Sequence, residues 1–240
     1  MTMIEVRGLT KCFGPVRAVD DVSFTVTPGI LTGFLGPNGA GKTTTLRMLL
    51  SLVEPDSGLA AIGGRRYRDI PDPVHRVGAA LEAASFHPGR TARDHLRVHA
   101  AAGRVSQSRV GEVLELTGLA AAARRRIGGF SLGMRQRLGL ATALLGDPAV
   151  LILDEPANGL DPHGVRWLRD LFRGLAAEGR TVLVSSHVLG EVAMIADSVI
   201  IMNHGRLITH APLAELTAQT GKSLEEAFFG LTGTEPQVPR

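Results

Sequence analysis

The stretch that most limits how this chain can fold is Gly36-Pro37-Asn38-Gly39-Ala40-Gly41-Lys42-Thr43. The apolar run 30–35 precedes it as a predicted strand, and residues 43–52 follow it with the leucine spacing of a helix. A strand, a glycine-rich loop ending in Gly-Lys-Thr, and a helix together indicate a phosphate-binding loop. A glycine-rich turn with an incidental lysine is the alternative, and the flanking strand and helix argue against it. The sequence therefore predicts a nucleotide site on an α/β core.

Each residue type in this loop has a chemical reason to be there. Glycines let the backbone approach a polyphosphate, so that N–H groups of the loop and of the helix start face its oxygens. We expect the ammonium of Lys42 to lie between the β- and γ-phosphates, and the hydroxyl of Thr43 to bind Mg²⁺. The predicted nucleotide-binding residues of the loop are Gly36, Pro37, Asn38, Gly39, Ala40, Gly41, Lys42, Thr43 and Thr44.

Two carboxylates follow an apolar run further along the chain. Residues 150–153 have the length of a buried strand, and Asp154 and Glu155 come directly after it. We expect Asp154 to complete the magnesium shell with Thr43, because Mg²⁺ prefers hard oxygen ligands. Glu155 could orient and deprotonate a water for attack on the γ-phosphate, which is worth roughly 10²–10⁴ in rate. Carboxylates also mark strand ends in solvent, and the glycine loop favours the catalytic interpretation.

Three histidines and an arginine run offer further candidates. His187 follows a predicted strand at 182–184 and could donate a hydrogen bond to the γ-phosphate or to the attacking water. His95 and His99 have a helical spacing that can bind zinc, but a third ligand is missing nearby, so we interpret them as exposed helix polarity. Arg124-Arg125-Arg126 is interpreted as a solvated face, because a binding patch needs basic residues clustered on one surface.

The remaining pattern predicts a mostly parallel, covered sheet with a helical insertion. Residues 4–27 alternate as strands, with Val22, Phe24 and Val26 on one face. Apolar runs at 150–153, 182–184 and 199–202 have the length of buried strands, and helical or turn sequence separates them. The helical stretches between residues 83 and 130 are 94–102, 110–116 and 119–123, and Ser131 opens a further helix that ends near residue 145. Short helices are expected at 213–216 and 223–231.

Length and composition add limits on class and compartment. A chain of 240 residues can bury a substantial core, and its formal charge of +3 is too small to indicate a nucleic-acid partner. Cys12 is the single cysteine, so an intrachain disulfide cannot form and a reducing compartment is expected. The sequence begins without an apolar secretory segment, and it lacks the run of about 18 apolar residues that a spanning helix needs. We expect a cytoplasmic protein, or one that another chain holds at a membrane.

A second anion-binding terminus lies 23 residues before Asp154. Ser131 at a predicted helix start, with Gly133 close behind, can present backbone N–H groups to an anion. One bound nucleotide does not need two such sites in a single chain. The simplest explanation is that this terminus serves a nucleotide held by a neighbouring copy.

These motifs, in this order over about residues 3–230, closely resemble the ATP-binding subunit of ATP-binding-cassette (ABC) transporters. Gly36–Thr43 resembles the Walker A loop, and Leu151–Glu155 resembles Walker B with its catalytic glutamate. The resemblance implies an α/β P-loop NTPase core with a mostly parallel sheet, an N-terminal antiparallel β subdomain and an inserted helical subdomain at about 83–130. Residues 231–240 would form a disordered tail.

The resemblance also assigns roles to single residues outside the phosphate loop. Ser131-Leu132-Gly133-Met134 resembles the signature motif, in which Ser131, Gly133 and Met134 would contact the ATP of a partner copy. Asp161 of Gly159-Leu160-Asp161 resembles the D-loop aspartate, His187 the switch histidine, and Phe13 the aromatic residue that stacks on adenine. Ordinary core packing is the alternative for Phe13.

Two positions depart from the family pattern. The signature reads Ser-Leu-Gly-Met where Ser-Gly-Gly-Gln is commoner, although Ser131 and Gly133 keep the polar contacts and the close backbone approach. Glu82 occupies the position of the Q-loop glutamine, where a carboxylate could still contact Mg²⁺ but changes the charge near the phosphates. Together with Phe130–Arg137 and the ending Ser223–Phe229, it makes the chain similar to bacitracin- and drug-exporter-type cassettes.

The resemblance therefore implies an ATP- and Mg²⁺-dependent ATPase that forms a dimer, either of two identical copies or with a related cassette. It would act on a separate transmembrane permease at the inner face of the cell membrane, with the helical subdomain as the docking surface and with export as the expected direction. Two alternatives are a non-transport ATPase acting on ribosomes or DNA and a module that binds ATP without hydrolysis. The single cassette and the absence of a long coiled coil argue against the first, and Glu155 and His187 argue against the second.

Overall fold

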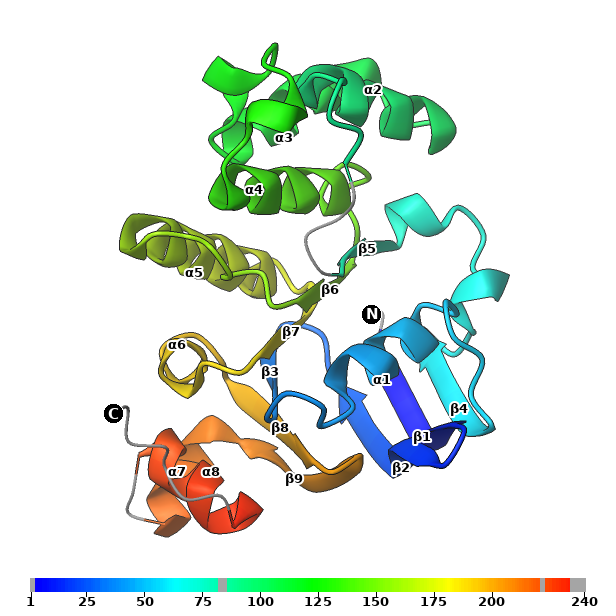
Figure 1. Cartoon of the computed structure of the whole chain (residues 1–240), viewed down its shortest axis with the longest axis vertical. Helices are drawn as coiled ribbons and strands as arrows, with labels where there is room; N and C mark the ends of the chain where they lie inside the picture. Colours follow the sequence, from blue (N-terminus) through cyan, green and yellow to red (C-terminus); the bar gives the residue numbers. More distant parts are fainter. Residues whose placement is uncertain (1–2, 82–85, 221–222, 234–240) are drawn as a thin grey trace.

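The computed structural model describes residues 3–81, 86–220 and 223–233, and it begins with an antiparallel sheet (Figure 1). Its order is β2-β1-β4. In β2, Val22, Phe24 and Val26 are buried while Ser23 is exposed, so the predicted alternation is confirmed. The strands of this sheet are β1 (Ile4–Phe13), β2 (Val16–Val26) and β4 (Ser57–Ile62).

The second sheet has six strands in the order β5-β6-β7-β3-β8-β9. All neighbours in it are parallel except β9, which pairs antiparallel with β8. The predicted P-loop NTPase core with a mostly parallel sheet is therefore confirmed, while β5 and β9 were not predicted. The strands are β3 (Leu31–Leu35), β5 (Val77–Ala80), β6 (Val150–Asp154), β7 (Thr181–Ser186), β8 (Ser198–Asn203) and β9 (Arg206–Pro212).

Helices cover both sheets and divide the core into three clusters. Leu46 and Leu49 of α1 pack in one cluster with residues of both sheets, such as Phe24 and Ile152. The α5 helix packs in a second cluster with the helical insertion, and α6 and α8 pack in a third. The α-helices are α1 (Lys42–Leu49), α2 (Ala92–Ala102), α3 (Gln107–Leu116), α4 (Leu132–Ala143), α5 (Pro162–Ala177), α6 (Leu189–Ala193), α7 (Leu213–Thr220) and α8 (Leu224–Thr232).

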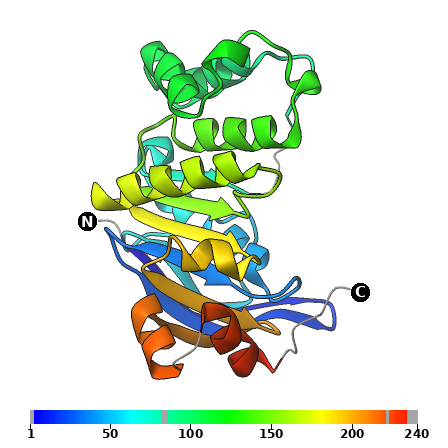
Figure 2. The same ribbon diagram turned by 90° about the vertical axis from the view of Figure 1, so that its left-hand side faces the viewer.

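The helical insertion lies between β5 and β6 in the chain, and α2 and α3 form the end of the molecule farthest from α8 (Figures 1 and 2). One predicted helix in it is wrong. Residues 119–123 contain only the short 3₁₀ turn Ala120–Ala122. The reason is a tertiary contact: the carbonyl of Ala123 accepts a hydrogen bond from the N–H of Arg93 at 2.9 Å, which turns the chain along the start of α2.

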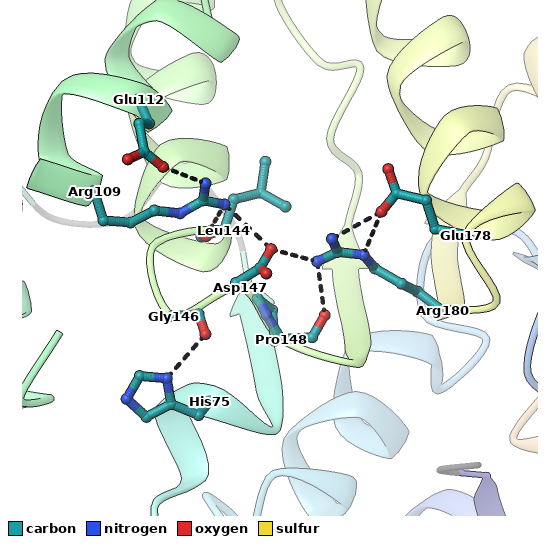
Figure 3. Close-up of polar contacts among 9 residues, drawn as sticks. All are labelled: His75, Arg109, Glu112, Leu144, Gly146, Asp147, Pro148, Glu178 and Arg180. Carbon is teal, nitrogen blue, oxygen red and sulfur yellow. Dashed lines mark hydrogen bonds and ion pairs between the residues drawn. The ribbon is translucent and has the colours of Figure 1, made fainter. Parts of the chain in front are cut away.

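Asp147 connects the insertion to the core (Figure 3). It lies in the turn between α4 and β6, where its Oδ1 accepts hydrogen bonds from Arg109 of α3 at 3.2 Å and from Arg180 before β7 at 2.8 Å. Glu112 forms an ion pair with Arg109, and Glu178 forms one with Arg180. The network therefore joins the insertion, the turn and the sheet through one carboxylate.

Candidate functional site

The candidate site lies at the carboxyl ends of three adjacent parallel strands. The loop 36–41 follows β3, Glu155 follows β6, and His187 follows β7, in a sheet where β6, β7 and β3 are neighbours. Parallel strands end at the same edge of a sheet, so residues far apart in sequence converge there. A cleft of about 810 Å³ opens at this edge. Its lining includes Asn38–Thr44, Asp154, Glu155 and Asn158.

The glycine loop keeps its backbone open toward this cleft. Gly39 and Gly41 have φ angles of 80° and 100°, which L side chains rarely adopt. A Cβ on Gly39 would meet no atom within 4 Å, whereas one on Gly41 would lie 2.4 Å from the carbonyl oxygen of Ala18. Among the described residues, no side chain caps the start of α1. Its first N–H groups, which cannot bond within the helix, therefore remain available to an anion.

Lys42 is a buried ammonium held by backbone carbonyls. Its Nζ donates to the oxygen of Gly36 at 2.6 Å and to that of Pro37 at 3.3 Å. Glu155 Oε1 lies 4.0 Å away. Burial lowers the pKa of Lys42, and the carboxylates of Glu155 and Asp154 oppose that shift. This positive group thus lies beside the glycine loop, ready to pair with an incoming anion.

Asp154 is fixed by hydroxyl donors on both of its oxygens. Thr43 Oγ1 donates to Oδ2 at 2.8 Å, and Ser185 Oγ donates to Oδ1. The residue is only 1% exposed. Ser185 also accepts a hydrogen bond from the N–H of Glu155 at 3.0 Å. Sequence reasoning missed Ser185, because its contact with Asp154 depends on the register of β7 against β6.

Glu155 and His187 form a direct pair across two strand ends. His187 Nδ1 lies 2.8 Å from Glu155 Oε2. An ionised carboxylate can only accept hydrogen bonds, so Nδ1 must carry the proton when Glu155 is charged. Glu155 itself has a φ of 49°, and Gln136 of α4 donates to its carbonyl at 3.0 Å. Glu155 thus lines the cleft while Ser185 and Gln136 hold its backbone.

Of the predicted signature motif, only Leu132 is among the described residues that line this cleft. Of α4, Leu132 and Gln136 line it, whereas Ser131, Gly133 and Met134 are not among the described lining residues. Ser131 caps α4 by accepting from the N–H of Met134 at 3.2 Å. A Cβ on Gly133 would lie 2.9 Å from the carbonyl oxygen of Gly159.

Three further residues that were predicted to bind the nucleotide or the metal are not among the described residues that line the cleft. Asp161 caps α5, with Oδ1 accepting from the N–H of Gly164 at 2.7 Å. Phe13 is 50% exposed and is not among the described residues that line the cleft, although Val16, Arg17 and Ala18 line it. Glu82 lies outside the described residues.

The histidine pair of α2 differs from its predicted exposed setting. His95 is only 8% exposed, its ring packs edge-on against Phe86, and its Nε2 lies 3.3 Å from Thr142 Oγ1. His99 lies beside it, with ring centroids 4.5 Å apart. The prediction of exposed polarity is therefore wrong for His95, because α2 packs this face against α4. The described residues hold no cluster of three or more metal-ligating side chains, so the pair lacks the partners of a zinc site.

The chemistry of the cleft fits a nucleoside triphosphate with magnesium. A volume of about 810 Å³, glycines without side chains and a buried ammonium suit a polyphosphate. Thr43 and Asp154 supply hard oxygens, and Mg²⁺ usually combines one or two protein ligands with substrate phosphates and water.

In the described part of the chain, no helix is long and apolar enough to cross a bilayer.

Comparisons with known proteins agree with this chemistry. A family model described as "ABC transporter" matches residues 19–158. The bacitracin transport ATP-binding protein BcrA of Bacillus licheniformis is 42% identical over 227 residues, which cover 93% of this chain and 74% of that protein. The daunorubicin/doxorubicin resistance ATP-binding protein DrrA of Streptomyces peucetius is 36% identical over 226 residues, with 92% and 68% covered.

Solved structures are similar over nearly the whole chain. The structure of an ATP-binding subunit of an ABC transporter aligns with a TM-score of 0.87 and 30% identity, covering 95% of this chain and 99% of that one. A dimeric ATP-binding cassette in a post-hydrolysis state, bound to ADP and Pi, aligns with a TM-score of 0.79 and 22% identity, covering 87% and 98%. At that identity the second likeness concerns the fold alone.

Proposed function

This chain belongs to the ABC transporter family of ATP-binding proteins, whose cassettes are ATPases, and from that premise we propose that it powers a separate membrane permease. Two copies would close on two ATP molecules and reopen after hydrolysis. The proposed cargo is a drug, a peptide antibiotic or another small molecule, and the proposed direction is export. The support for this cargo class is the similarity to proteins named for bacitracin transport and for daunorubicin and doxorubicin resistance.

The observation that carries the proposal is the Glu155–His187 pair beside the glycine loop. Asp154 is buried and both of its oxygens accept hydrogen bonds from hydroxyl groups, so it is less accessible to an attacking water. Glu155 is reachable, because its side chain is 20% exposed and the residue lines the cleft. Glu155 is therefore the proposed general base that takes a proton from the attacking water, and His187 holds it in orientation.

The rest of the site would hold the substrate still. The N–H groups of the loop and of the first turn of α1 would cradle the phosphates, and Lys42 would exchange its carbonyl partners for phosphate oxygens. Thr43 and Asp154 would hold Mg²⁺, which when bound neutralises charge on the phosphates. Such positioning supplies most of the catalysis in phosphoryl transfer.

The proposed dimer follows from where the signature residues lie. Ser131 is exposed, and it does not line its own cleft among the described residues. In a dimer, the start of α4 would complete the site of the other copy, with N–H groups facing the γ-phosphate. Asp161 and the loop before it would lie at the same contact, and Phe13 would stack on adenine at the rim of the cleft.

The variant Glu155→Gln tests the catalytic assignment. It removes the base but keeps the shape of the site, so ATP binding should persist while phosphate release falls by roughly 10²-fold or more. Phosphate release and ATP binding are measured side by side, and Glu178→Gln, an exposed carboxylate of the Asp147 network, is the charge-matched control. Hydrolysis at the parental rate in Glu155→Gln would show that another group acts as the base.

Co-purification tests the proposed partner. The protein purified from membranes should carry a multispanning membrane chain with it. Association with ribosomes or DNA in place of such a chain would contradict the transport assignment and favour the non-transport alternative.

A further inference from the structure

The charges of this chain are unevenly divided between the helical insertion and the rest. Counted through the end of α4, residues 86–143 contain ten arginines and three acidic residues, a net charge of +7. The whole chain carries +3, so the remaining residues together carry −4. A modest overall charge therefore hides a strongly basic part, and such an asymmetry indicates an anionic partner for that part.

The structure brings the arginines of two segments together. The N–H of Arg93 donates to the carbonyl of Ala123 at 2.9 Å, and the N–H of Ile127 donates to the carbonyl of Arg90 at 2.9 Å. Thr91 and Arg126 form an isolated β-bridge between the same two segments. The arginine triplet thus lies alongside the start of α2 rather than standing alone. We define the arginine patch as Arg90, Arg93, Arg97, Arg124, Arg125 and Arg126.

All six side chains are exposed, and within the described residues none of them forms an ion pair with a carboxylate. Other arginines of the chain behave differently: Arg109 is paired with Glu112 and Asp147, and Arg68 is paired with Glu54. The acidic residue within the patch, Asp94, accepts a hydrogen bond from Thr91 at 2.7 Å. Six arginines and one aspartate leave the patch with a net charge of +5 facing solvent.

We propose that the arginine patch binds the anionic lipid headgroups of the membrane on which the permease partner lies, an inference that rests on the proposed function. Basic clusters near a membrane are attracted by the negative surface potential of its cytoplasmic leaflet. A nucleic acid fits less well, because single strands need exposed aromatic rings for stacking. Here Phe130 is buried beneath Arg125 and Phe86 is partly buried.

Vesicle binding by the full chain tests this proposal without the permease. The probes are vesicles of phosphatidylglycerol mixed with phosphatidylcholine, and vesicles of phosphatidylcholine alone. The parent protein should sediment with the first and not with the second, and this binding should weaken when salt rises from about 0.05 M to about 0.5 M. The triple variant R93Q/R124Q/R126Q should bind roughly a hundredfold more weakly. It leaves Arg125 in its contacts with Gly129 and Phe130.

Two matched variants separate the patch from general charge and from specific recognition. R65Q/R66Q/R68Q removes the same number of charges next to Glu54, outside the insertion, and should bind vesicles like the parent. R93K/R124K/R126K keeps the charge and should also bind, because a bilayer surface responds to charge rather than to the shape of a guanidinium. Thermal unfolding confirms that each variant is folded.

Several results would overturn the proposal. Equal loss of binding in R93Q/R124Q/R126Q and R65Q/R66Q/R68Q would show that only net charge matters. Failure of the parent to bind phosphatidylglycerol vesicles at low salt, or tighter binding to single-stranded RNA or to an acidic peptide, would assign the patch to another partner. Failure of the proposed function itself would appear separately, as unchanged phosphate release in Glu155→Gln.

Discussion

Gly41 illustrates how few atoms decide whether a phosphate loop can form. Its φ of 100° and the carbonyl of Ala18, 2.4 Å from where a Cβ would lie, both exclude a side chain. Gly39 shares the positive φ but has open space around it. A side chain at Gly39 would therefore meet backbone strain alone, whereas one at Gly41 would meet both backbone strain and a steric clash.

We expect Gly41→Ala to lower the free energy of unfolding by about 1–3 kcal/mol, because the added methyl group must move the chain at Ala18 as well as strain the backbone. Gly39→Ala should cost about 1 kcal/mol or less, since only the strain applies. Urea denaturation of both variants measures the difference. Equal losses would mean that the contact with Ala18 relaxes without cost.

Single residues also show the limits of sequence reasoning. The common position of the glycine loop, Asp154, Glu155 and His187 was predictable, because each lies at the end of an apolar strand and parallel strands end together. Ser185 and Gln136 were not, because their contacts depend on the register of β7 against β6 and on how α4 packs. Neither is visible in a local pattern.

At the scale of elements, α2 is an amphipathic helix whose buried face includes His95. Burial, together with the nearby His99 and Arg90, lowers the pKa of His95 from 6.5 to about 4. In the unfolded chain the ring takes up a proton as pH falls below 6.5, while in the folded protein it stays neutral down to about pH 4. Acid therefore favours the unfolded chain across this window.

We expect the parent protein to lose about 1–2 kcal/mol of stability between pH 7 and pH 5 through His95. The variant His95→Gln lacks this titration, so its stability should change less over the same interval. Urea denaturation at the two pH values gives both slopes. If the slopes are the same, His95 is as accessible to protons in the folded protein as in the unfolded chain.

The Asp147 network allows a second prediction for elements. Asp147 has a φ of 53°, a conformation that asparagine also tolerates, so Asp147→Asn removes the charge and keeps the backbone. We expect a loss of about 0.5–1 kcal/mol, because the pairs with Arg109 and Arg180 are partly exposed. Urea denaturation at low and high salt checks it. The difference between parent and variant should shrink at high salt, and a salt-independent difference would contradict an ionic origin.

Some elements were predictable and others were not, for physical reasons. The apolar runs of β6, β7 and β8 predicted buried strands, and they are confirmed. In β5, Gly78 and two alanines give little strand propensity, and the strand exists because it pairs with β6. In β9, residues alternate between exposed and partly buried, so no apolar run marked it.

At the scale of the whole molecule, Ser131 is exposed and is not among the described residues that line its own cleft, which leads to a prediction about assembly. In the Glu155→Gln background, ATP should produce a stable dimer, and adding Ser131→Arg should abolish it while ATP binding by the monomer persists. Light scattering after size-exclusion chromatography measures the mass. Ser223→Arg is the control, since it also removes a helix cap, at the start of α8. Unchanged dimerisation in the Ser131→Arg protein would remove the shared-site proposal.

The arrangement of the two sheets was only partly predictable. The phosphate loop and the apolar runs predicted a parallel core, but the placement of α1 comes from long-range packing, in which Leu46 and Leu49 share one core cluster with residues of both sheets. Of the tail expected at residues 231–240, residues 231 and 232 belong to α8, and residues 234–240 lie outside the described residues.

Residues 86–143 and the rest of the chain carry net charges of opposite sign, and this charge asymmetry acts over distances longer than a direct contact. A body carrying +7 near one end and −4 elsewhere is an electric dipole. Near a negatively charged boundary, such a dipole experiences a torque that turns its positive end forward within about one Debye length, roughly 8–10 Å in physiological salt. A freely tumbling molecule would thus approach the boundary insertion first, already oriented before any bond is made.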